Sequence, residues 1–67
     1  MPRIVFEITH GDGKWKVSRR GHGIISTHAT KESAFEDGRR VASQSQPSLL
    51  KILNADDTVE SELTYGD

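Results

Sequence analysis

The chain has 67 residues, nine basic and ten acidic side chains, a net charge of −1 and no cysteine. A chain of about this length forms one small domain, residues 1–67, and without cysteine it has neither disulfides nor thiolate metal ligands. No signal peptide pattern begins the sequence, and no apolar run approaches the roughly 20 residues of a membrane-spanning helix, so we expect a soluble cytoplasmic protein.

Alternating apolar and polar residues predict two strands near the N-terminus. The first runs from Arg3 to His10 and the second from Lys14 to Arg20. Opposed residues of antiparallel strands share a face, so Ile8 is expected opposite Val17. This register leaves Asp12-Gly13 as a two-residue turn, whose central positions both need positive φ.

A third, shorter strand is expected from Ile24 to Ala29. Its inward-facing residues are either the set beginning at Ile24, with Ser26 and His28, or the set beginning at Ile25, with Thr27 and Ala29. Both phases fit the alternation of a strand, and the residues alone do not decide between them.

One helical pattern lies between Thr30 and Pro47, with Thr30 as N-cap and Pro47 as the stop. A glycine in the middle of a helix costs about 1 kcal/mol relative to alanine, so Gly38 indicates a close approach of the helix to the sheet. Small or apolar residues recur at the spacing of a single buried face. They are Ala34, Phe35, Gly38, Val41 and Ala42.

The last two strands are predicted from Leu49 to Leu53 and from Thr58 to Tyr65, joined by a two-residue loop at Asp56-Asp57 that sets Leu50 opposite Leu63. Glu60 and Glu62 are then expected together on the solvent face, as a charged edge that discourages strand addition. The expected fold is α+β, an antiparallel sheet of four to five strands with one helix packed on one face, in the order β-β-β-α-β-β.

Several short motifs follow one another in an order that resembles a small bacterial family, the domain of unknown function 2188. The similarity runs from about Ile4 to Gly66, with Asp56-Asp57 where the family usually has Asp-Gly and Asn54 where it usually has Gly. The resemblance implies a compact unit of strand hairpin, helix and hairpin, and it implies no activity. The motifs are Gly13-x-Trp15-x-Val17, Thr30-x-Glu32-x-Ala34, Gly38-Arg39, Leu50-x-Ile52, Asp56 and Tyr65-Gly66.

The residues give little support for catalysis or for a cofactor. His10, Asp12 and His22 lack the spacings of metal ligands and are explained as turn residues. The paired glycines around positions 12 and 22 join strand to strand, whereas phosphate-binding loops lead from a strand into a helix. No Ser, His and acid are singled out as a nucleophilic set. We therefore expect no metal, no cofactor and no enzymatic activity.

Basic residues concentrate on the first hairpin, at Lys14, Lys16, Arg19 and Arg20. Residues 1–31 carry six basic side chains against two acidic ones, whereas residues 32–67 carry three against eight. Such a cluster is able to contact phosphates of a nucleic acid. Trp15 is expected to face inward, so it offers no stacking platform for bases.

A single helix covers a single face of a sheet, so Val5, Leu49 and Leu53 are expected on the uncovered side. Clustered apolar residues of this kind mark interfaces, and a small core gains from association. The leading prediction is a non-enzymatic protein-interaction module that self-associates as a homodimer. The alternative is a weak nucleic-acid-binding protein that uses the basic first hairpin.

Overall fold

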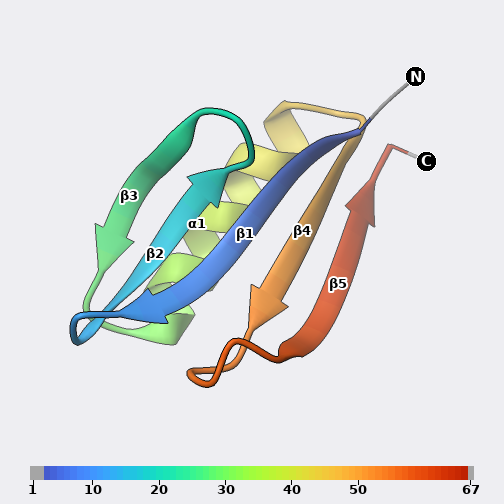
Figure 1. The fold of residues 1–67 in the computed structure, drawn as a ribbon. Coiled ribbons are helices and arrows are strands. Elements are labelled where there is room, and N and C mark those ends of the chain that lie inside the picture. The colour runs from blue at the N-terminus through green and yellow to red at the C-terminus, as the bar shows by residue number, and fades with distance from the viewer. Residues whose placement is uncertain (1–2, 67) are drawn as a thin grey trace.

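The computed structural model describes residues 3–66, which form five strands and one helix in the predicted order β-β-β-α-β-β. The strands make one sheet in the order β3-β2-β1-β4-β5, with α1 across one face (Figure 1). The predicted α+β fold is confirmed. The elements are β1 (Ile4–Gly11), β2 (Lys14–Arg19), β3 (Gly23–His28), α1 (Lys31–Gln44), β4 (Ser48–Leu53) and β5 (Val59–Tyr65).

The centre of the sheet is a parallel pair, β1 beside β4, whereas the other three strand pairs are antiparallel. The expectation of an antiparallel sheet therefore holds for the hairpins and needs one correction at the centre. The physical reason is that α1 carries the chain back along the sheet, so that β4 starts at the same end as β1 and runs in the same direction (Figure 1).

The core lies between α1 and the three central strands. At Gly38 the helix approaches so closely that an added Cβ would lie 3.1 Å from Ile8 Cδ1 and 3.2 Å from Leu50 Cδ1, which confirms the predicted close approach. Phe35 and Val41 are only partly buried at the margins of this contact. The buried apolar side chains are Phe6, Ile8, Val17, Ala34, Ala42, Leu50 and Ile52.

Both ends of α1 are closed by hydroxyl groups. The Ser33 N–H donates to Thr30 Oγ1 at 3.2 Å, which confirms Thr30 as N-cap. At the other end the buried Ser48 Oγ donates to the Ala42 carbonyl at 2.6 Å. The helix ends at Gln44, before Pro47 is reached. Within residues 3–66, no helix combines the length and the apolar character that crossing a membrane requires.

The first turn is as predicted and the last is not. Ile8 pairs with Val17, and Asp12 and Gly13 take positive φ values of 55° and 74°. In the last hairpin the Asn54 N–H donates to the Thr58 carbonyl at 2.7 Å, which leaves a three-residue loop, 55–57, in place of the predicted two-residue one.

A β-bulge in β5 compensates for the longer loop. Ile52 pairs with Ser61 and Leu53 with Val59, so Glu60 is an extra residue on β5. The predicted pairing of Leu50 with Leu63 is nevertheless confirmed, because the bulge restores the register beyond it.

A second bulge lies in β3 and explains why its phase was ambiguous. Val17 pairs with Ser26 but Ser18 pairs with Ile24, so Ile25 is the extra residue. Ser26 and His28 face α1, as their hydrogen bonds to the helix show. Ile24 lies on the other side of the register shift, and therefore neither of the two predicted phases describes the whole strand.

Candidate functional site

The sheet face opposite α1, here called the open face, turns toward the viewer in Figure 1. The strand registers and the alternation of side chains put all three predicted interface residues on this face. Side chains alternate across a strand, and the parallel register sets Val5 directly beside Leu49. Leu53 lies opposite Val59 of β5, which is 52% exposed. The open face therefore has two apolar pairs, one near each end of β4.

A row of charges separates these two apolar pairs. Glu7 lies beside Lys51, and Lys51 lies beside Glu62, so that acids flank a central base. Arg20 Nη2 is 3.3 Å from Glu7 Oε2, and Lys51 Nζ is 4.0 Å from Glu62 Oε2. A partner that covers the open face has to match both the apolar pairs and this alternation of charge, because unpaired charges are costly to bury.

The four predicted basic contact residues are divided between the two ends of β2. Lys14 and Lys16 lie next to the β1–β2 turn, where Lys16 Nζ is 3.8 Å from Asp12 Oδ2. Arg19 pairs with Phe6 and so belongs to the helix side, whereas Arg20 follows it on the open face. The register therefore puts Lys14, Lys16 and Arg20 on the open face and leaves Arg19 on the helix side.

The structure also joins polar residues that sequence reasoning left apart, on β3 and α1. Ser26 Oγ donates to Asp37 Oδ2 at 2.6 Å and lies 2.9 Å from His28 Nε2, while His28 Nδ1 lies 2.8 Å from Ser33 Oγ. Arg40 pairs with the same Asp37 carboxylate. The hydrogen bond from Ser26 and the nearby Arg40 guanidinium hold the pKa of Asp37 below its ordinary value, against the opposing effect of burial.

The order Ser33, His28, Asp37 has the outline of a nucleophilic triad. A serine hydrolase also needs donors aimed at the oxyanion and a pocket for the acyl group. Ser33 lies in the first turn of α1, its own N–H is taken by Thr30 Oγ1, and the hollow beside it is wide open. With their side chains only 18% and 15% exposed, His28 and Asp37 are better suited to holding β3 against the helix.

One signal for this cluster is present in the sequence. Ser33 and Asp37 are four residues apart and so share a side of α1, and Ser26 and His28 are two apart and share a face of β3. Only the phase of β3 brings the two pairs together, and the bulge at Ile25 conceals that phase.

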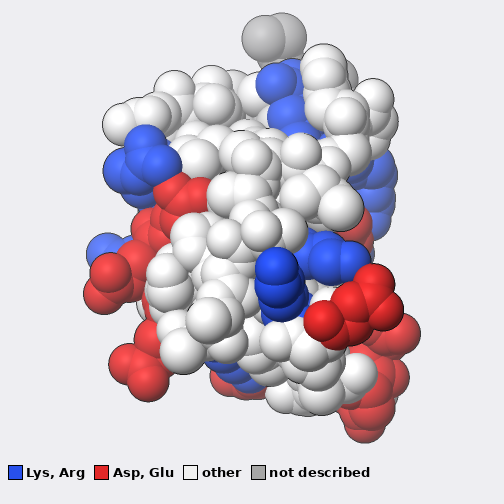
Figure 2. Space-filling view, turned by 90° about the vertical axis from the view of Figure 1, so that its left-hand side faces the viewer, with Lys and Arg blue, Asp and Glu red and all other residues white. Residues whose placement is uncertain are grey.

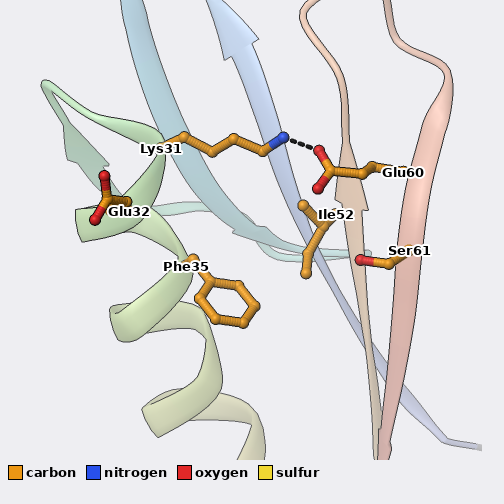
Figure 3. Close-up of a pocket in the computed structure, with 6 residues that line it drawn as sticks. All are labelled: Lys31, Glu32, Phe35, Ile52, Glu60 and Ser61. Carbon is orange, nitrogen blue, oxygen red and sulfur yellow. Dashed lines mark hydrogen bonds and ion pairs between the residues drawn. The ribbon is translucent and has the colours of Figure 1, made fainter.

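A hollow of about 280 Å³ lies between α1 and β5 (Figure 3). Phe35 and Ile52 form its apolar part, and Lys31 reaches across to an ion pair with Glu60. The expectation that Glu60 shares a solvent face with Glu62 is wrong, because the bulge turns Glu60 toward the helix. Among the described residues, no group of three His, Asp or Glu side chains is arranged to hold a metal ion.

The edge strand β3 has no Lys, Arg, Asp or Glu, and two of its residues, Ile24 and Ile25, are 60% and 44% exposed. Figure 2 shows this side of the molecule as a largely uncharged area with most of the charged groups at its margins. Bulges in edge strands hinder the addition of a further strand, and both β3 and β5 contain one. The open face is thus the better-formed candidate surface.

The fold and its surfaces define a small α+β domain with one helix and one uncovered sheet face. Over residues 6–65 the chain matches the family described as an uncharacterized protein conserved in bacteria, DUF2188, and it belongs to that family. The resemblance seen in its motifs is confirmed. No curated protein matches the chain, and no solved structure does.

Proposed function

We propose that this domain is a non-enzymatic interaction module that self-associates through its open face, around Val5, Leu49 and Leu53. The observation that carries the proposal is the position of the single helix, which covers one face of a five-stranded sheet and leaves two apolar pairs on the other. A domain of this size has a small core, so burying those pairs against a second copy adds stability that the monomer lacks.

Charge complementarity supports a second copy as the occupant. In the expected dimer the open faces of two subunits stack, and the two-fold axis runs parallel to the strands, over the gap between β1 and β4. This axis stacks β1 of one subunit on β4 of the other. It sets Val5 against Leu49 of the partner subunit and Glu7 against the partner's Lys51. The parallel register of β1 and β4 makes this arrangement possible, because along the strands Val5 is level with Leu49 and Glu7 is level with Lys51. Aligned sheet packing of this kind is common in β-sandwiches.

The first experiment is the mass in solution, measured by light scattering at high micromolar concentration. We expect the mass of a dimer, largely insensitive to salt, which falls to that of one chain in Leu53→Glu. Gln44→Glu is the matched control, because it adds the same charge on the exposed side of α1 and leaves the dimer intact. A wild-type mass of one chain throughout the concentration range would count decisively against the proposal.

The second experiment tests the axis. Glu7→Lys places lysine against the partner's Lys51, and Lys51→Glu places glutamate against the partner's Glu7, so each variant alone is expected to be monomeric. Mixed in equal amounts, the two variants are expected to form a heterodimer in which both contacts join opposite charges. A mixture that stays monomeric, with both variants folded, would refute this arrangement.

Nucleic-acid binding through the first hairpin is the second candidate function. It is supported by the register, which puts Lys14 and Lys16 together on the open face beside the turn. Binding of an oligonucleotide that weakens steeply with salt and is lost in Lys14→Glu/Lys16→Glu would favour it. Binding that the double variant leaves unchanged would exclude this hairpin.

A further inference from the structure

The largest gathering of arginines in the described chain surrounds a hollow of about 250 Å³ at the end of β2 remote from the β1–β2 turn. Its lining has three arginines, a histidine and two aliphatic side chains, and no carboxylate. We call it the arginine hollow. It is lined by Arg3, Ile4, Val5, Arg19, Arg20 and His22.

Backbone hydrogen bonds fix the elements that form the arginine hollow. The Arg20 N–H donates to the Val5 carbonyl at 2.9 Å, which extends the pairing of β1 with the chain beyond β2. The His22 N–H donates to the Arg19 carbonyl at 2.9 Å and closes the following turn. Gly21 takes a φ of 88° in that turn, a value that residues with a Cβ rarely adopt. Arg19, Arg20 and His22 therefore project from backbone that hydrogen bonds hold in place.

Arg19 and Arg20 approach the hollow from opposite sides of the sheet, because consecutive side chains of a strand alternate. Glu7 is the one carboxylate in contact with these arginines, through Arg20 Nη2 at 3.3 Å. A guanidinium has five N–H donors, so this contact orients Arg20 and leaves donors for a ligand. The aliphatic side chains of Ile4 and Val5 complete the lining of the hollow.

We propose that the arginine hollow binds a phosphate group, either as free phosphate or as part of a nucleotide. The planar fork of arginine matches the oxygens of phosphate and donates two parallel hydrogen bonds to them, and three arginines in the lining of one hollow favour a doubly charged anion. The aliphatic side chains of Ile4 and Val5 offer a contact for the sugar or base of a nucleotide. This site goes beyond self-association, and it excludes Lys14 and Lys16, which lie at the opposite end of β2.

The test is a titration of the ¹⁵N-labelled protein with inorganic phosphate and, separately, with adenosine monophosphate, at constant ionic strength. We expect concentration-dependent amide shifts confined to residues 3–5 and 19–22. Tighter binding of the nucleotide would identify it as the source of the phosphate, and equal binding would identify free phosphate. Val5 also belongs to the proposed dimer interface, so the titration is repeated on Leu53→Glu, where binding reports on the hollow alone.

The matched comparison is between two double variants with the same change of charge. Arg3→Gln/Arg19→Gln is expected to weaken phosphate binding at least about tenfold, as loss of charge-assisted hydrogen bonds does. Lys14→Gln/Lys16→Gln is expected to change it less than about twofold. If the first variant does not fold, Arg3→Gln alone serves, because Arg3 is exposed.

Three outcomes would overturn the inference. They are an absence of shifts at tens of millimolar phosphate, shifts that centre on Lys14 and Lys16, and equal weakening by the two double variants. None of them bears on self-association, which the solution mass decides. A dimer that binds no phosphate would refute the phosphate site and leave self-association standing. A monomer that binds phosphate would refute self-association and leave the phosphate site standing.

Discussion

Replacing Gly38 with alanine sets two effects of known size against each other. Alanine in a helix interior is favoured over glycine by about 1 kcal/mol. The new Cβ, however, would lie 3.1 Å from Ile8 Cδ1 and 3.2 Å from Leu50 Cδ1, below the roughly 3.5–4.0 Å of an ordinary carbon contact. Both neighbours are fully buried, so each has to move within a filled core.

The cost of adding a methyl group to a packed core is typically about 1–3 kcal/mol. After subtraction of the helix term, we expect Gly38→Ala to lower the free energy of unfolding by about 1 kcal/mol. For a domain of this length such a change lowers Tm by roughly 4–8 °C. Because the proposed self-association makes stability depend on protein concentration, wild type and variant are compared at one concentration by urea unfolding and thermal melting.

The helix provides its own control at Glu36, which is exposed. The difference in stability between Glu36→Ala and Glu36→Gly measures the preference for alanine in α1 without any core contact. If Gly38→Ala stabilises the protein by that same difference, the methyl group is accommodated freely. The close approach would then not be the reason for glycine at this position, and the argument from packing would be refuted.

Three further predictions concern single side chains. Ser48→Ala removes the buried hydrogen bond to the Ala42 carbonyl and is expected to lower the free energy of unfolding by about 1–2 kcal/mol in urea. Asp57→Gly relieves a non-glycine φ of 69° and is expected to raise it by up to about 1 kcal/mol. The pKa of Asp37 is lowered on folding, so its contribution is present above the unfolded value of 3.8 and disappears as the pH falls through the folded value. The stability difference between wild type and Asp37→Asn is therefore expected to be largest near neutral pH and to shrink in acid.

Each of these has an outcome that contradicts it. Ser43→Ala removes an exposed hydrogen bond of the same type, to the Arg40 carbonyl, and an equal loss there would show that burial of Ser48 is unimportant. Asp57→Gly would contradict the strain argument if it destabilised the hairpin. A difference between wild type and Asp37→Asn that stayed constant down to pH 2 would show that Asp37 does not titrate with folding.

The sequence predicted those parts of the fold that depend on local chemistry. Asp12-Gly13 specifies a turn by its positive φ values, and the register of Ile8 with Val17 follows from it. Thr30 and Gly38 act through the backbone next to them and were also interpreted correctly. The parallel pairing of β1 with β4 was missed, because it depends on where the helix returns the chain.

The two bulges could not be predicted, because each adds one residue to an otherwise regular alternation. Ile25 and Glu60 are the added residues, and from each of them onward the side chains change face. The error at Glu60 had a direct consequence, since a residue assigned to the solvent face pairs with Lys31 of the helix. The arginine hollow was predicted only in part, because Arg19 and Arg20 were assigned to the basic hairpin but the hollow that they share with Arg3 depends on how side chains pack at the end of the sheet.

The first strand of the domain, β1, occupies the middle of the sheet. β1 has β2 on one side and β4 on the other, and Phe6 and Ile8 on it belong to the core. β1 ends at Gly11 and β4 begins at Ser48, so the central pair of the sheet joins segments that lie far apart along the chain. Contacts between segments that are distant in sequence slow folding, and the intermediates that form before them expose apolar surface that favours aggregation. The pairing of β1 with β4 is therefore expected to form after the local β1–β2 hairpin, and it is the contact on which closure of the core depends.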